Sequence, residues 1–258
     1  MELLVIYGLV FILGLLVGSF LNVVIYRYNT GMSVVSGRSR CLTCAHTLRW
    51  FELIPVVSFV IQAGRCRECH SRLSWQYPAV ELLTGLIFLR VFQVVGGNAH
   101  NLELAFWWLV FSILIVITIY DLRHKIIPDG LVGLLAGLAV LQWLIFPALA
   151  ISNYLLAGFS LFGFFALLWW VSQGRWMGFG DAKLALALGL LLGLQGGVST
   201  VVLAFWLGAL VGLFILTLSR LSLGERSFTI KSEIPFAPFL AVGLALYFLF
   251  NVNVLTFF

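Results

Sequence analysis

Long stretches of apolar residues without a charged side chain follow one another along most of the 258-residue chain. A transmembrane helix needs about 20 predominantly apolar residues. Uncharged stretches of about this length or longer cover 3–26, 104–120, 130–172, 184–219 and 234–258. A further apolar stretch, 79–96, has Glu81 near its start and Arg90 within it. This pattern predicts membrane-spanning helices.

Two of these stretches are too long for one crossing. As a single helix, 130–172 would measure about 65 Å, roughly twice the hydrocarbon core of a bilayer. We therefore expect a break between Pro147 and Asn153. We expect the stretch 184–219 to break at 195–197, which leaves a short sixth helix. The sequence predicts an all-α polytopic membrane protein of about eight transmembrane helices.

Composition supports this class of protein. Hydrophobic residues make up 62% of the chain and charged residues only 10%, with a mean hydropathy of +1.10, whereas soluble domains carry about a quarter charged residues. A soluble globular fold is excluded. Residues 1–26 have no basic segment before the apolar stretch and no small-residue cleavage site after it, so we interpret them as the first transmembrane helix and not as a signal peptide.

Basic residues fall almost entirely in alternate loops. Of the 15 Lys and Arg residues, 14 lie in the segments 27–78, 121–129, 172–183 and 219–233, whereas the turns 97–102, 148–152 and 195–197 hold none. With eight helices, the four basic segments share one side, which the positive-inside rule assigns to the cytoplasm, and both termini face outward. Membrane topology explains the net charge of +5 more simply than nucleic-acid binding, so we expect no nucleic-acid partner.

All four cysteines lie in the largest of these loops, as two Cys-x2-Cys pairs: Cys41 with Cys44, and Cys66 with Cys69. Two such pairs can present four thiolates tetrahedrally to Zn²⁺. The loop is too short to bury a sizeable core, so a metal would supply much of its folding free energy. Two disulfides are the alternative, but a reducing cytoplasm argues against them. The loop 27–78 is therefore predicted to be a cytoplasmic insert with a closed, structural zinc site, and the nearby His46 and His70 are not needed as ligands.

Few carboxylates lie at membrane depth, where ionisable residues are costly and are functional candidates by default. Asp121 ends the third predicted helix, and Asp181 opens the sixth. Under the predicted topology both lie at the cytoplasmic ends of their helices, so the two side chains could meet. Two facing carboxyl groups share a proton, as in aspartic proteases. Gly178 and Gly180, just before Asp181, would let a substrate backbone approach.

Each aspartate also has a structural interpretation. Asp181 could favour the positive end of its helix or pair with Lys183, and Asp121 could pair with Arg123 or Lys125. Because the two acids lie at matched depth, we favour catalysis for the pair. Asp129, which follows Pro128, is predicted to be a structural helix N-cap.

Other polar and small residues predict helix contacts. Glu81 could cap a helix or shape a cytoplasmic cleft, and Ser19 and Asn22 share a helix face that should hydrogen-bond a neighbouring helix. The small-residue pairs that predict close helix packing are Gly14 with Gly18, Gly133 with Gly137, and Gly208 with Gly212, and a further small face comprises Ala185, Gly189 and Gly193.

Several motifs occur in a characteristic order. They are Gly18-Ser19-Phe20-Leu21-Asn22-Val23-Val24-Ile25-Tyr26-Arg27, the two cysteine pairs, Tyr77-Pro78-Ala79-Val80-Glu81-Leu82-Leu83-Thr84, Asp121 with Ile127-Pro128-Asp129, Met177-Gly178-Phe179-Gly180-Asp181-Ala182-Lys183-Leu184, and Ile234-Pro235-Phe236-Ala237-Pro238-Phe239-Leu240-Ala241. Together they resemble the type IV prepilin peptidase family, the bacterial inner-membrane leader peptidases of type IV pilus, type II secretion and competence systems.

The resemblance implies a catalytic pair, Asp121 and Asp181, supported by Gly178, Gly180 and Lys183. It implies a prepilin or pseudopilin substrate whose short basic leader is removed on the cytoplasmic side of the membrane. It also implies that the new N-terminal amine is then methylated from S-adenosylmethionine, because the cysteine-bearing insert accompanies the bifunctional members. The residues themselves indicate no methyl-donor pocket, since a glycine-rich strand-to-helix loop is absent from the sequence.

Other functions are weaker interpretations of the same features. The chain could be a peptidase without methyl transfer. A presenilin-like intramembrane protease would also use Tyr-Asp and Gly-x-Gly-Asp, but the chain lacks a Pro-Ala-Leu motif after Asp181. A non-catalytic zinc-bearing assembly or transport protein would place its acids in mid-membrane and show inverted repeats, and neither feature is present. The predicted organisation is a first helix (1–26), the zinc insert (27–78) and a seven-helix membrane domain (79–258).

Overall fold

The computed structural model describes residues 2–96, 101–146, 148–221 and 235–256. Most of the predicted turn 97–102 and the residues Pro147, Arg226, Lys231 and Ile234 lie outside this part. The chain forms two compact units, Met1–Val116 and Ile117–Phe258, and the boundary falls within one helix, α4 (Asn101–His124). Across the described residues the structure is helical, with two isolated β-bridges, which confirms the predicted all-α class.

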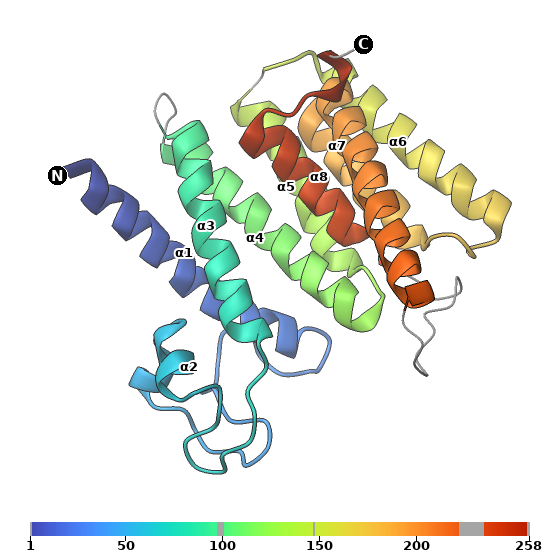
Figure 1. Ribbon diagram of the computed structural model, residues 1–258. Coiled ribbons are helices and arrows are strands. Elements are labelled where there is room, and N and C mark those ends of the chain that lie inside the picture. The colour runs from blue at the N-terminus through green and yellow to red at the C-terminus, as the bar shows by residue number, and fades with distance from the viewer. Residues whose placement is uncertain (1, 97–100, 147, 222–234, 257–258) are drawn as a thin grey trace. The chain divides into compact units, whose positions relative to one another are not determined.

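The first unit contains α1 (Glu2–Arg27), the short helices η1 (Trp50–Leu53) and α2 (Val57–Ile61) of the insert, α3 (Gln76–Val95) and the first part of α4. Figure 1 shows α1 and α3 side by side, with the insert at one end of the pair. Small residues allow this packing, because a Cβ at Gly14 or Gly18 would lie 2.7 Å from the α3 backbone. The predicted contact of this glycine pair is confirmed.

The second unit contains the end of α4, then α5 (Asp129–Ile145), α6 (Ile151–Ser172), α7 (Phe179–Leu221), α8 (Ala237–Phe250) and a terminal turn, η2 (Val254–Thr256). Helix α7 packs against α5, α6 and α8, so it forms the centre of this unit. The predicted break between Pro147 and Asn153 is confirmed, since α5 ends at Ile145 and α6 starts at Ile151.

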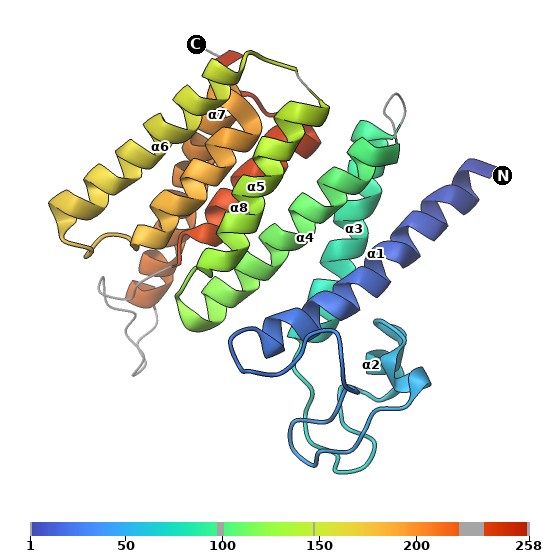
Figure 2. The same ribbon diagram turned by 180° about the vertical axis from the view of Figure 1, so that it is seen from behind.

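Helix α7 is a hairpin of two helical arms, 179–192 and 194–221. Gly193 breaks the helix with φ 71° and ψ −175°, a conformation essentially restricted to glycine. The chain reverses there, because a Cβ at Gly197 would lie only 3.3 Å from the Cα of Gly189. The two arms lie side by side in Figure 2.

The predicted position of this break was therefore wrong by a few residues. Gly196 and Gly197 are helical. Larger residues would not fit at these positions, because a Cβ added at Gly196 would lie 2.7 Å from the Tyr247 side chain, and one added at Gly197 would lie 2.9 Å from the Leu161 side chain. The turn is stabilised instead by Asn153, whose Oδ1 accepts a hydrogen bond from the backbone N–H of Leu194 at 2.9 Å.

Counting both arms of α7, the described residues form eight apolar helical segments, as predicted. Five helices are long and apolar enough to cross a membrane, and two shorter apolar helices, α5 and α8, accompany them. Gly189 packs against the backbone of Ala157 and Gly158, which confirms the predicted close contact at this residue. Gly193, predicted to lie on the same face, is instead the break between the two arms. The close helix packing predicted for the other two glycine pairs was wrong. Nothing lies within 4 Å of a Cβ added at Gly133, Gly137 or Gly212, and a Cβ added at Gly208 would make only ordinary van der Waals contacts.

Candidate active site

Asp121 lies near the end of α4 with only 4% of its surface exposed. The backbone N–H of Ala237, at the start of α8, donates a hydrogen bond to its carboxylate. The carboxylate oxygen Oδ2 is buried and accepts no hydrogen bond from any described residue. A buried carboxyl oxygen without a partner is costly, so it is a candidate for interaction with a water or a substrate.

Asp181 lies in the first turn of α7 and is 5% exposed. Its Oδ2 accepts a hydrogen bond from the backbone N–H of Gly178 at 3.1 Å, as expected for an acid at a helix N-terminus. Gly180 has a separate role: a Cβ there would lie 3.0 Å from Ile127, in the segment that joins α4 to α5. The glycine therefore allows the start of α7 to lie against the residues that follow Asp121 in the chain.

The two carboxyl groups belong to the same compact unit and are close enough to interact electrostatically. They come from different helices, and both are almost fully buried. Since two such groups cannot both be ionised without strong repulsion, they can share a proton. An ionised and a protonated carboxyl group side by side can act as a general base and a general acid.

Lys183, the alternative partner considered for Asp181, forms an ion pair with Asp129 instead. Lys183 Nζ lies 2.7 Å from Asp129 Oδ1 and 5.4 Å from the ring centre of Phe179. The interpretation of Asp129 as an N-cap was wrong, because Pro128 is the N-cap residue of α5 and Asp129 starts the helix. The Asp129 side chain is 70% exposed and instead joins the first turns of α5 and α7.

The four cysteines form one cluster in the insert. One sulfur atom from each of Cys41, Cys44, Cys66 and Cys69 lies within 4.8 Å of all the others, and all four thiols are free. The Sγ atoms of Cys41 and Cys69 are 3.9 Å apart, close to the roughly 3.8 Å expected for two thiolates bound tetrahedrally at 2.3 Å from zinc. The donor set therefore fits a closed zinc site.

The two Cys-x2-Cys turns of this cluster have the same pattern of backbone hydrogen bonds. Cys41 N–H donates to the carbonyl of His46, and Cys66 N–H donates to that of Ser71, both at 2.9 Å. An isolated antiparallel bridge flanks each turn, Arg40 with Thr47 and Arg65 with Arg72. This repetition explains how a loop without a large core places four sulfur atoms together.

The surroundings of the thiols favour thiolate at some positions. Burial disfavours ionisation of Cys41, but hydrogen bonds from the backbone of Cys44 and Thr43 lower its pKa to about 6. The hydroxyl of Ser71, 3.1 Å from Cys69 Sγ, lowers the pKa of Cys69. His46 is not a ligand in this arrangement, because its Nε2 lies 3.5 Å from Glu52 Oε2.

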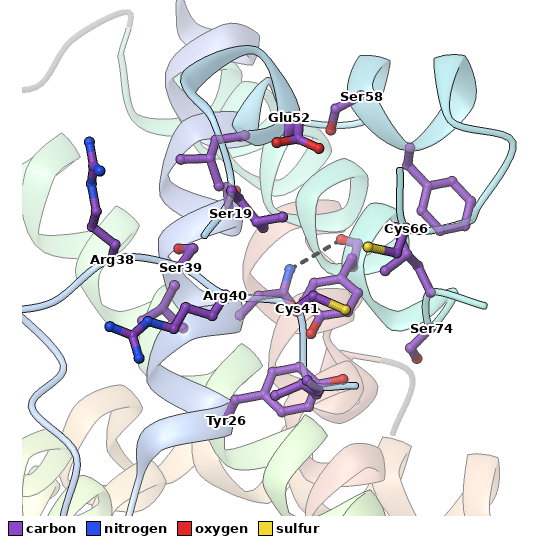
Figure 3. Close-up of a pocket in the computed structure, with 18 of the residues that line it drawn as sticks. Ser19, Tyr26, Arg38, Ser39, Arg40, Cys41, Glu52, Ser58, Cys66 and Ser74 are labelled. Carbon is purple, nitrogen blue, oxygen red and sulfur yellow. Dashed lines mark hydrogen bonds between the residues drawn. The ribbon is translucent and has the colours of Figure 1, made fainter. Parts of the chain in front are cut away.

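A large cavity lies between the insert and the ends of α1 and α3, all within the first unit. Its volume is about 730 Å³. Figure 3 shows its walls: Ser19 and Tyr26 come from α1, and Cys41, Glu52, Ser58 and Cys66 come from the insert. From the sequence, Glu81 was the one residue expected to shape a cleft here, and Glu52 was not singled out, because no local motif marks a space between segments distant in the chain.

Glu81 and the strained Val56 join the insert to α3. Glu81 Oε2 accepts a hydrogen bond from the Val56 backbone N–H at 2.7 Å. Val56 has φ 61° and ψ −50° and is the central residue of a γ-turn closed by Val57 N–H and the Pro55 carbonyl. This conformation is rare and strained for a β-branched residue. Of the two predicted roles of Glu81, the shaping of a cleft is the one its position supports, because Glu81 lines the cavity.

The features described so far define a helical membrane protein with a pair of buried, interacting carboxyl groups and a four-cysteine insert. The chain belongs to the type IV leader peptidase family. Residues 108–213 match the profile of this family, and residues 12–95 match that of the bacterial peptidase A24 N-terminal domain.

Curated relatives support this assignment. A prepilin leader peptidase/N-methyltransferase of Bacillus subtilis is 30% identical over 253 residues, which cover 97% of each chain. Proteins with the same name from Pseudomonas putida and Myxococcus xanthus are 33% and 38% identical. The alignments cover 86% of the Pseudomonas protein and 62% of the longer Myxococcus protein. No solved structure matches the chain significantly.

Proposed function

We propose that this protein is a membrane aspartic endopeptidase that removes the leader of type IV prepilins or pseudopilins and then methylates the new N-terminus. One observation supports the peptidase half most directly: Asp121 and Asp181, from different helices, are both buried and interact electrostatically. The names of the relatives supply both activities.

The proposed mechanism uses the pair as base and acid. The ionised aspartate takes a proton from a water molecule as its oxygen attacks the carbonyl carbon of the scissile peptide bond, and the protonated aspartate donates to the carbonyl oxygen as it becomes tetrahedral. The shortage of partners around Asp121 Oδ2 makes this oxygen the better candidate to contact the water. Collapse of the tetrahedral intermediate, with proton transfer to the nitrogen, releases the leader and the new amine.

The proposed position of the active site relative to the membrane rests on the loops that hold most of the Lys and Arg residues. By the positive-inside rule, these loops support a cytoplasmic position for the insert and for the helix ends that carry the two aspartates. The membrane in this proposal is the bacterial inner membrane. A short basic leader would remain on the cytoplasmic side, while the apolar helix that follows it enters the bilayer. The zinc bound by the four cysteines is structural in this proposal, and S-adenosylmethionine supplies the methyl group.

The test is cleavage of a purified prepilin by the full-length protein in proteoliposomes. Asp121→Asn and Asp181→Asn should each reduce cleavage to background, because an amide can neither accept the proton of the water nor share one with its neighbour. Asp129→Asn is the matched control, since its carboxylate is largely exposed at the end of a neighbouring helix, and it should cleave at nearly the wild-type rate. Cleavage by either of the first two variants would refute the pair.

A further inference from the structure

The segment 50–61 of the insert is almost entirely apolar, and one side of it is exposed. Its single charged residue is Glu52, which is buried and lines the cavity (Figure 3). The large apolar side chains of this segment that are 39% to 78% exposed are Trp50, Leu53, Ile54, Val57, Val60 and Ile61. Soluble proteins rarely expose large apolar patches, so such a surface marks contact with a partner protein or a membrane.

Helical spacing gathers these side chains on one face of α2. Val57, Val60 and Ile61 are three and four positions apart along the helix, so they share a face. Phe59 lies on the other face and is buried. Its ring centre is 4.9 Å from that of Trp75, the residue just before α3, and Trp75 is itself 77% exposed. The exposed apolar side chains of 50–61 together with Trp75 are called the apolar face of the insert.

Two contacts hold α2 beside the first turns of the membrane helix α3, near which Figure 1 shows it. One is the contact of Phe59 with Trp75. In the other, the N–H of Val56, the N-cap residue of α2, donates to Glu81 Oε2 at 2.7 Å. Glu81 lies about 7 Å along α3 from its start at Gln76.

The length of α3 converts this position into a depth in the membrane. A bilayer requires about 20 apolar residues for a crossing, so all 20 residues of α3 are needed. The first turns of α3, and the start of α2 bound to them, therefore lie at the level of one leaflet. A protein partner would have to displace lipid to cover the apolar face.

Basic residues bracket the apolar segment. Arg49 directly precedes it, and Arg65 follows the end of α2 by four residues. Both are exposed. Among residues 27–78, all of which the structure describes, the acids are Glu52 and Glu68, against seven Arg. Long basic side chains reach from an apolar surface to the headgroups, and positive charge beside a bilayer attracts anionic lipids.

We propose that the apolar face of the insert lies in the headgroup region of the adjacent leaflet and binds anionic lipids. The segment 50–61 is too short to cross the bilayer, and a length of about 10–14 apolar residues is typical of an interfacial segment. Its Trp and aliphatic side chains enter the lipid, as in the aromatic belts of membrane proteins, while Arg49 and Arg65 contact lipid phosphates. This inference goes beyond the proposed function and depends on neither activity.

The test places one photoreactive residue in the full-length, zinc-loaded protein, as Ile61→p-benzoylphenylalanine or as Leu42→p-benzoylphenylalanine. The two side chains are similarly exposed, at 78% and 76%, so both positions have room for the larger residue. Leu42 lies in the first cysteine turn, outside the apolar face, and is the matched control. The protein is reconstituted in vesicles of phosphatidylcholine and phosphatidylglycerol in equal amounts, and mass spectrometry identifies the adducts formed on illumination.

The residue at position Ile61 should form lipid adducts at least about fivefold more often than the one at position Leu42. Adducts with phosphatidylglycerol should outnumber those with phosphatidylcholine. Combining Arg49→Gln and Arg65→Gln should lower this ratio about twofold or more, because the charges that attract the anionic lipid are lost. The zinc content of each variant, measured in parallel, shows that its insert is folded.

Several results would overturn the inference. Equal lipid adducts at the two positions would show only that the whole insert lies near the vesicle. Adducts of the Ile61 position with a second copy of the chain, with another part of the same chain or with added prepilin would replace the lipid by a protein partner. An absence of adducts would place the face in water. A lipid ratio of one, unchanged by the arginine substitutions, would refute the binding of anionic lipid.

The outcome is separable from that of the proposed function. Prepilin cleavage is measured in the same vesicles before illumination. A protein that forms the expected lipid adducts and cleaves no prepilin would refute the peptidase proposal alone. A protein that cleaves prepilin and forms no lipid adducts at the Ile61 position would refute the membrane contact alone.

Discussion

A Cβ atom at Gly180 would lie 3.0 Å from the Cβ of Ile127, so the start of α7 and the connection after α4 approach at a position with little room for a side chain. Asp181 follows this glycine directly, and Asp121 lies six residues before Ile127. The close approach of Gly180 and Ile127 therefore connects the two segments that carry the candidate catalytic pair.

Gly180→Ala should reduce prepilin cleavage at least tenfold. The added methyl group displaces either Ile127 or the first turn of α7 by a few tenths of an ångström, and small misplacements of catalytic groups cost large factors in rate. Cleavage rates in proteoliposomes test this expectation. Gly137→Ala on α5, where nothing lies within 4 Å of the added Cβ, is the matched control. Equal rates for the two variants would contradict the role assigned to the contact.

The pair of Lys183 and Asp129 should contribute little to stability. Both side chains are partly exposed, at 37% and 70%, and exposed ion pairs contribute about 0–1 kcal/mol. A double-mutant cycle of Lys183→Met and Asp129→Asn, followed by thermal unfolding, should give a coupling free energy below about 1 kcal/mol. Cleavage should fall by less than about fivefold in Lys183→Met. A loss as large as that of Asp181→Asn would instead place this lysine in the chemistry.

The helices of this protein could be predicted closely because the bilayer sets their length. The number of apolar segments and the break before α6 followed from counting uncharged residues. The turn inside α7 was displaced by a few residues, because Gly193, Gly196 and Gly197 look alike in a sequence. Only the tertiary contacts distinguish them: Asn153 binds the turn at Gly193, whereas the other two glycines make room for Tyr247 and Leu161.

The candidate sites also differ in how far the sequence alone could predict them. Four cysteines in two short-range pairs predict a metal site from spacing alone, and the cluster in the structure agrees with it. The proximity of Asp121 and Asp181 could be predicted because the membrane places both helix ends at one depth. Nothing comparable marks Glu52, Glu81 and Tyr26, which come from three segments and meet only at the cavity. The partner of Lys183 was also missed, because Asp129 lies 54 residues earlier in the chain.

Gly193→Ala should destabilise the second unit by at least about 2 kcal/mol. Positive φ with extended ψ is strained for any residue with a Cβ, at about 1–3 kcal/mol, and this Cβ would also lie 2.6 Å from Asn153 Oδ1. Asn153→Ala should cost about 1 kcal/mol, because it removes the acceptor of the Leu194 N–H. Thermal unfolding in detergent measures both.

The control for this prediction is Gly212→Ala on the second arm of α7. Nothing lies within 4 Å of a Cβ there, and alanine is the better helix former. Its melting temperature should equal or exceed that of the wild type. If Gly193→Ala melted at the same temperature as Gly212→Ala, the chain could not reverse at Gly193 in the way described.

Zinc removal should unfold the insert and leave the helical membrane part folded. The insert has few buried apolar residues, and a structural zinc supplies free energy on the order of 10 kcal/mol to small domains of this kind. Wild-type protein should hold one zinc ion per chain, as four thiolate ligands require, and Cys44→Ser should hold far less. Elemental analysis gives the zinc content, and limited proteolysis should show new cuts only between the first and second membrane helices. Ser39→Ala, which changes a neighbouring residue that is not a ligand, should keep both the zinc and the protease resistance. An insert that stays resistant in Cys44→Ser would show that hydrogen bonds such as those of Glu52 and Glu81 hold it without the metal.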